Sequence, residues 1–66
     1  MHITLNGEEH ELPTPMSVSA LLEKLELEPR KIAVERNLEI VPRSAYETTI
    51  IDGGDRLEIV QFVGGG

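Results

Sequence analysis

Hydrophobic and polar residues alternate over residues 1–5, which is the period of a half-buried β-strand. Asn6-Gly7 follows directly, and this dipeptide favours a type I′ hairpin turn because both turn positions need a positive φ angle. The pattern therefore predicts a β-hairpin whose second strand covers residues 8–12. Since that strand is rich in glutamate and has low β propensity, we expect it at an edge of the sheet.

A two-residue turn would pair Ile3 with His10 and His2 with Glu11. Alternate residues of a strand point to opposite faces, so the two histidines would lie on opposite faces of the hairpin. They could then neither share a metal ion nor act together in acid–base chemistry. The same alternation divides the glutamates of the second strand between the faces, and we predict no metal site.

The apolar spacing becomes helical after Ser17, which is suitable as an N-cap because its hydroxyl can accept a hydrogen bond from the first turn. The residues at positions i, i+3, i+4 and i+7 are Val18, Leu21, Leu22 and Leu25. They form one apolar stripe, as in an amphipathic helix that packs on a core. We expect Pro29 to end this helix.

Short apolar runs bounded by turn residues predict three further strands. They cover residues 32–35, 40–42 and 56–62. Pro42 restricts the second of them to a sheet edge or makes it very short. Residues 43–46 are expected to be irregular or to form a single turn, and residues 52–55, with two glycines, a tight turn.

The predicted order is strand, strand, helix, strand, strand, strand. A helix that lies across one face of a small mixed sheet buries both elements with short connections. This α+β arrangement is the β-grasp fold. We predict it for residues 1–63, followed by a flexible glycine tail at residues 64–66.

The length and composition limit what such a domain can do. A chain of 66 residues has room for one core, and without cysteine it can supply no iron–sulfur ligand, thiol nucleophile or persulfide. The net charge of −6 disfavours nucleic acid as a partner and favours a protein with a basic face. No apolar run could span a bilayer and no export signal precedes the first strand, so we expect no membrane association and a cytoplasmic location.

The last predicted strand is apolar on both faces near its end. Leu57 and Ile59 lie on one face, and Val60 and Phe62 lie on the other. Either the helix or residues 43–51 cover Val60 and Phe62, or the two side chains stay exposed and anchor a docking partner. We favour the docking interpretation, more strongly for Phe62.

Gly64, Gly65 and Gly66 follow this strand. They could be frayed terminal residues or a remnant of cloning. Alternatively, because glycine has no side chain, they could thread a narrow channel and present the carboxylate of Gly66 to a nucleotide-activating enzyme. A domain this small can hardly enclose a catalytic pocket besides its core, so we expect a substrate of partner enzymes and not an enzyme.

Several short blocks occur in order along the whole chain. They are NG at 6–7, SVSALLEKL at 17–25, IAVERN at 32–37, IVPRS at 40–44, DGGDRLEIV at 52–60 and the final glycines. Together they resemble the ThiS family, the sulfur carrier proteins of thiamin thiazole biosynthesis. That family often has Asn-Gly where this chain has Asn37-Leu38, which leaves the type of that turn open, and a single glycine where this chain has Gly53-Gly54.

The resemblance implies a ubiquitin-like β-grasp fold and a reactive Gly66. In such carriers a ThiF-type adenylyltransferase activates the terminal carboxylate with ATP and magnesium, which the carrier itself does not bind. Sulfur from a donor such as a cysteine desulfurase then gives a thiocarboxylate, which a ThiG-type thiazole synthase uses. By position, Gly65 and Gly66 match the terminal pair of the family, and Gly64 is an additional glycine.

Three other functions stay open at this point. The chain could be a MoaD-like sulfur carrier that serves molybdopterin synthesis, although such chains tend to be longer. It could be a ubiquitin-like modifier in which Gly66 forms an isopeptide bond to a lysine. It could also be a plain binding module whose glycines have no role.

Overall fold

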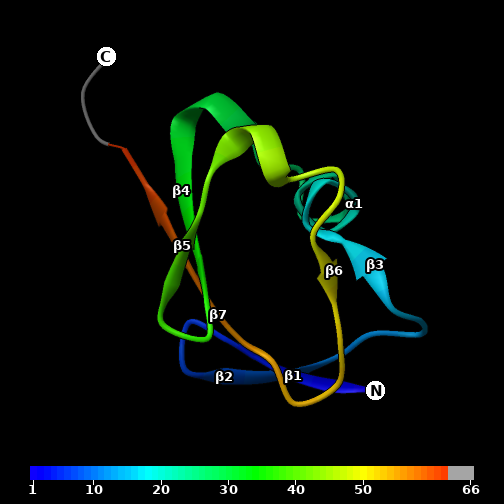
Figure 1. Ribbon diagram of the computed structural model, residues 1–66. Coiled ribbons are helices and arrows are strands. Elements are labelled where there is room, and N and C mark those ends of the chain that lie inside the picture. The colour runs from blue at the N-terminus through cyan, green and yellow to red at the C-terminus, as the bar shows by residue number, and fades with distance from the viewer. Residues whose placement is uncertain (63–66) are drawn as a thin grey trace.

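The computed structural model describes residues 1–62, in which a five-stranded sheet is covered on one face by a helix (Figure 1). The strands of this sheet are β1 (His2–Leu5), β2 (Glu8–Glu11), β4 (Ile32–Arg36), β5 (Glu39–Val41) and β7 (Arg56–Gln61). The remaining elements are β3 (Met16–Ser17), α1 (Val18–Lys24), β6 (Ile50–Ile51) and two 3₁₀ turns, η1 (Pro29–Lys31) and η2 (Arg43–Ala45).

The strands of the main sheet lie in the order β2-β1-β7-β4-β5. β1 and β7, the first and last strands in the sequence, are parallel neighbours inside the sheet, and the other pairs of this sheet are antiparallel. This is the predicted β-grasp arrangement. The two-residue strands β3 and β6, which pair with each other, were not predicted because two residues show no periodicity.

The first hairpin has the predicted register, with Ile3 opposite His10 and His2 opposite Glu11. Asn6 and Gly7 both have positive φ angles, of 51° and 81°, as a type I′ turn requires. The glutamate-rich strand β2 lies at an edge of the sheet and is exposed along its length, as predicted.

Helix α1 begins as predicted but ends five residues before the position that we expected. The Ser17 hydroxyl accepts a hydrogen bond from the Ala20 N–H at 3.0 Å, which confirms the N-cap. The helix ends at Lys24, and Glu26 adopts a left-handed backbone with φ of 60°, so the prediction that Pro29 ends the helix was wrong.

Two hydrogen bonds explain this early end. The Glu26 N–H donates to the Glu23 carbonyl at 3.0 Å, and the Leu27 N–H reaches back to the Leu22 carbonyl at 2.9 Å. This pair of bonds is the Schellman motif, which satisfies the last carbonyls of a helix. Leu27 then packs against the core beside the helix that it has left.

The core lies between α1 and the sheet and is almost entirely aliphatic. Its buried residues are Ile3, Leu5, Leu12, Val18, Leu21, Leu22, Ile32, Val34, Val41, Tyr46, Ile51 and Leu57. The predicted apolar stripe of the helix supplies Val18, Leu21 and Leu22 in full, while Leu25 is half-buried. Within residues 1–62, no helix is both long and apolar enough to cross a membrane.

The turns after β4 and β6 largely follow the sequence. Asn37 and Leu38 both have positive φ angles, of 52° and 70°, so this turn is type I′ even though leucine occupies its second position. The predicted tight turn at residues 52–55 is present, with Gly54 at a φ of 87°. Pro42 follows β5 and caps η2, which keeps that strand short.

Candidate functional site

The C-terminal half of β7 divides its side chains between the core and the open face of the sheet, the face away from α1. Leu57 is fully buried and Ile59 is half-buried on the helix side. Val60 and Phe62 are 60% and 58% exposed, so neither the helix nor residues 43–51 cover them. The predicted division of faces is therefore confirmed, and the exposure that docking requires is present.

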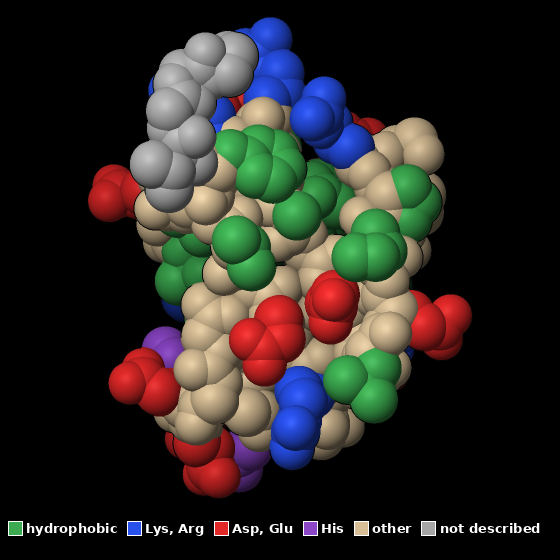
Figure 2. Space-filling model, turned by 90° about the vertical axis from the view of Figure 1, so that its left-hand side faces the viewer, with side chains coloured by type: hydrophobic (Ala, Val, Ile, Leu, Met, Phe, Trp, Pro, Cys, Tyr) green, Lys and Arg blue, Asp and Glu red, His purple; other side chains and the backbone are tan. Residues whose placement is uncertain are grey.

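Strand pairing adds a residue that the sequence interpretation missed. On the open face, Val60 of β7 lies opposite Ala33 of β4. Ile40 of β5 lies opposite Glu35, on the other side of β4. Ile40 is 67% exposed. We call Ala33, Ile40, Val60 and Phe62 the open-face patch; Figure 2 shows hydrophobic side chains gathered on this face. Only the register of β5 against β4 could have placed Ile40 there.

The sheet holds β7 up to the last described residue. The Phe62 N–H donates to the Lys31 carbonyl at 2.8 Å, which continues the pairing of β7 with the β4 side beyond Gln61. Phe62, the last described residue, is therefore held in place by the sheet beside the rest of the open-face patch. Gly64, Gly65 and Gly66 lie outside the described residues, so their predicted roles stay predictions.

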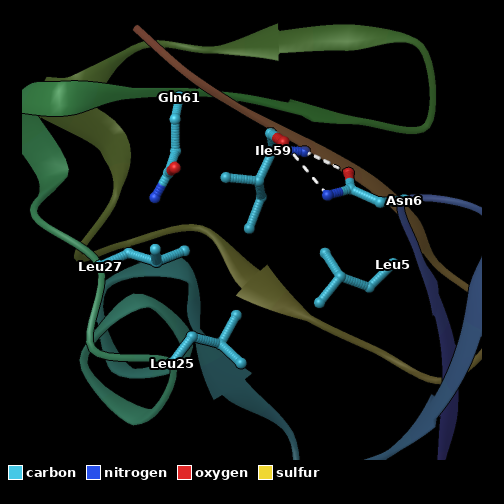
Figure 3. Close-up of a pocket in the computed structure, with 6 residues that line it drawn as sticks. All are labelled: Leu5, Asn6, Leu25, Leu27, Ile59 and Gln61. Carbon is cyan, nitrogen blue, oxygen red and sulfur yellow. Dashed lines mark hydrogen bonds between the residues drawn. The ribbon is translucent and has the colours of Figure 1, made fainter. Parts of the chain in front are cut away.

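Asn6 fixes the other edge of β7. Its side-chain Oδ1 accepts from the Ile59 N–H at 2.7 Å, and its Nδ2 donates to the Ile59 carbonyl at 3.2 Å (Figure 3). The backbone pairing of β1 with β7 covers only two residue pairs and stops at Leu5 opposite Leu57. The Asn6 amide thus takes the place of a further strand residue and extends the support of β7 towards its end.

A surface hollow of about 290 Å³ lies on the helix side of the same strand. Its lining residues are Leu5, Asn6, Leu25, Leu27, Ile59 and Gln61. In Figure 3, Leu25 and Leu27, which follow α1, face Leu5 and Ile59 of the sheet. None of the lining side chains is ionisable, so the hollow offers apolar contact and no acid, base or nucleophile.

Asp55 forms a buried polar cluster that joins two turns. Its Oδ2 accepts from Arg36 Nε at 2.8 Å and from the Asp52 N–H at 2.8 Å, and its Oδ1 accepts from Asn37 Nδ2 at 3.1 Å. Burial opposes the ionisation of Asp55, yet these hydrogen bonds together outweigh it, and the pKa of Asp55 lies below its ordinary value. Every polar atom of the carboxylate has a structural partner, so we assign the cluster to the fold.

The two histidines lie where the register predicted. His2 Nδ1 is 3.7 Å from Glu9 and His10 Nε2 is 3.9 Å from Glu8, and all four side chains are largely exposed on the edge hairpin. In the part of the chain that the structure describes, no three histidine, aspartate or glutamate side chains come together as a metal site would require.

The described residues thus form an exposed apolar face next to the end of β7, and comparisons with known proteins identify the family of the chain. The profile of the ThiS family matches residues 3–66. The chain belongs to the ThiS family. The sulfur carrier protein ThiS of Bacillus subtilis is 40% identical over 50 residues, which are 76% of each chain.

A solved structure shows the fold of the same family. The crystal structure of the thiamine biosynthesis protein ThiS from Geobacter metallireducens superposes with a TM-score of 0.87 at 32% identity and covers the whole of both chains. The present chain also matches part of a larger protein. A thiazole synthase of Paramagnetospirillum magneticum is 53% identical over all 66 residues, which span only 20% of that relative.

Proposed function

We propose that this chain is a sulfur carrier in thiamin biosynthesis whose Gly66 carboxylate is adenylated and then converted to a thiocarboxylate that donates sulfur to thiazole formation. Membership of the ThiS family is the observation that carries the proposal. The thiazole synthase relatives, in which the matched 66 residues are 20% of the length, support a ThiG-type synthase as the partner that uses the sulfur.

The chemistry needs only a free carboxylate from this chain. One carboxylate oxygen of Gly66 attacks the α-phosphate of ATP, held with magnesium by a ThiF-type partner, and pyrophosphate leaves. The persulfide of a donor such as a cysteine desulfurase then attacks the acyl carbon, and AMP leaves. A second thiol cleaves the S–S bond of the resulting acyl disulfide, which leaves the thiocarboxylate on Gly66 and a disulfide between donor and thiol.

The open-face patch has a defined energetic task in this proposal. Ordering Gly64, Gly65 and Gly66 inside a partner costs on the order of 3–6 kcal/mol, because glycine loses the most backbone freedom. Covering the exposed parts of Val60 and Phe62 contributes about 1–2 kcal/mol each. Ile40 adds a similar amount, so the three side chains together can offset the cost of ordering the tail.

Intact mass spectrometry tests the proposal. The intact mass of the purified chain is measured first, to establish that Gly66 carries a free carboxyl group. The chain is then incubated with its adenylating enzyme, ATP, magnesium and a sulfur donor. A gain equal to the replacement of one oxygen by sulfur is expected. Attachment to lysines would indicate a modifier instead, and an unchanged mass with an active enzyme would refute both functions.

Two sets of variants separate activation from folding. Deletion of Gly66 should abolish adenylation without a change in the melting temperature, because within residues 1–62 the last side chain that packs against the core is that of Ile59. Val60→Ala and Phe62→Ala should weaken adenylation and also melt like the wild type. Ile50→Ala is the matched control, since Ile50 is exposed to a similar degree, at 49%, but lies on β6 away from the open-face patch. Equal loss in the control would contradict docking through this patch.

A further inference from the structure

Two glutamates lie directly opposite each other on the open face of the sheet. Glu35 of β4 and Glu58 of β7 are partners in the antiparallel pairing, so both side chains leave the same face. Figure 2 shows two acidic side chains next to one another at the edge of the hydrophobic ones on this face. Like charges at directly opposite positions destabilise a sheet, because the Cβ atoms of such pairs are only about 5 Å apart.

No ion pair within residues 1–62 neutralises either glutamate of this pair. The Arg36 guanidinium comes from the same strand, but it points to the other side and is bound to Asp55 at 2.8 Å. Arg56 is the nearest cation along β7 on the open face, and none of the ion pairs within residues 1–62 joins it to either glutamate. The free chain therefore carries two like charges at opposed positions, and neither has an ion-pair partner in the described residues.

The residues next to Glu35 and Glu58 indicate what kind of partner this pair of charges would accept. Glu35 lies between Glu58 and the exposed Ile40, and Val60 follows Glu58 on the same face. A protein that covers Ile40 and Val60 must also remove water from the two carboxylates between them. Desolvating two unpaired carboxylates is costly, so a partner can cover the patch only if it supplies a cation at this point.

We propose that the adenylating partner docks on the open-face patch and places one arginine side chain between the carboxylates of Glu35 and Glu58. A guanidinium suits the position, because it is planar, keeps its charge when desolvated and presents several N–H donors to two acceptors at once. The inference rests on the proposed function and adds the chemistry by which the partner is recognised.

The same pair disfavours wrong partners. Two copies of this chain that met through their apolar patches would bring four carboxylates together. An apolar surface without a basic residue would leave the pair buried and unpaired. The glutamates thus select one kind of surface, and their repulsion in the free chain is relieved only in the correct complex.

Binding and stability measurements on glutamine variants test this inference. The variants are Glu35→Gln, Glu58→Gln and the double variant, and affinity for the purified adenylating enzyme is measured at low and high salt. The double variant should bind about tenfold more weakly or worse and lose most of its salt dependence. Its melting temperature should equal or exceed that of the wild type, because the repulsion is gone.

The matched control is the double variant Glu23→Gln with Glu47→Gln. Both residues are exposed, on α1 and in the segment before β6, and the control removes the same two charges from the net −6. It should change affinity by less than about threefold. Equal weakening in the control, or wild-type affinity of the Glu35 and Glu58 variants, would overturn the inference. If the wild-type chain is not adenylated at all, the proposed function itself has failed.

Discussion

Leu38 adopts a backbone conformation that favours glycine. Its φ angle is 70° and its side chain is 83% exposed, so it gains little from packing in exchange for the left-handed backbone. For residues with a Cβ atom this conformation costs about 1–2 kcal/mol. The neighbouring Asn37 tolerates it better, because asparagine adopts this conformation more readily than other residues with a Cβ atom. Its Oδ1 also accepts a hydrogen bond from the Arg56 N–H at 2.9 Å, across the turn.

We therefore expect Leu38→Gly to stabilise the domain by about 1 kcal/mol through the relieved backbone conformation. The greater conformational entropy of glycine in the unfolded chain reduces this gain. In a domain of this size that gain raises the melting temperature by about 4–8 °C. Leu38→Ala is the control, because it removes the exposed side chain and keeps the Cβ atom. A similar rise in both variants, measured by thermal unfolding, would show that the backbone angle is not the cause.

Asp55 makes stability depend on pH in the acid range. Its pKa is lowered from 3.8 in the folded chain, so its ionised form stabilises the fold. That contribution is complete above the ordinary pKa and is lost as the pH falls through 3.8 towards the lower folded value. Asp55→Asn should lower stability by about 2–4 kcal/mol at neutral pH, because Arg36 loses its buried partner.

The corresponding measurement is chemical unfolding between about pH 2 and pH 6. The loss of stability below about pH 4 should be smaller in Asp55→Asn than in the wild type. Glu23→Gln serves as the control, since Glu23 is exposed on α1. Parallel curves for wild type and Asp55→Asn would show that the cluster does not titrate as inferred.

At the scale of elements, β7 depends on a side chain as well as on its neighbouring strands. Asn6 bonds the N–H and the carbonyl of Ile59, as a strand residue would do. Asn6→Gly keeps the positive φ angle of the turn and removes only the amide. We expect it to cost about 1 kcal/mol and to speed hydrogen exchange at the Ile59 N–H while exchange at Phe62 changes less. Unchanged exchange at Ile59 would contradict this bridging role.

The elements also show why sequence predicted some boundaries and not others. The Asn6-Gly7 turn and the Ser17 cap have local signals, and both were placed correctly. The end of α1 had none, because Glu26 occupies a position where glycine would have marked the Schellman motif. β3 and β6 exist only because the chain brings Met16 beside Ile51, a contact that no local pattern encodes.

The residues of the candidate site likewise differ in whether a local sequence pattern predicts their position. That Val60 and Phe62 share one face followed from alternation along one strand, which sequence shows directly, whereas their exposure came from the structure. Ile40 and the opposed glutamates required the register between strands that are distant in sequence, and tertiary pairing alone sets that register. The sequence therefore indicated which side chains of β7 share the open face and left the extent of the exposed apolar surface undetermined.

The whole molecule has a single small core, which sets its tolerance to substitution. A core in a chain this short supplies no more than about 3–5 kcal/mol of stability. Leu22 is fully buried, and Leu22→Ala costs about 2–5 kcal/mol, so this variant should be largely unfolded at 37 °C. Ile40→Ala removes a similar apolar volume from the open face and should stay folded. Circular dichroism distinguishes them, and a folded Leu22→Ala would mean that this core is not limiting.

The place of β7 inside the sheet has a mechanical consequence. A partner that draws in the segment after Phe62 pulls on β7 along the axis of the strand. Because β7 is bonded to β1 on one side and to β4 on the other, the pull loads the rungs of two ladders together instead of opening them one after another. The body should therefore resist a pull applied along β7 from its C-terminal end.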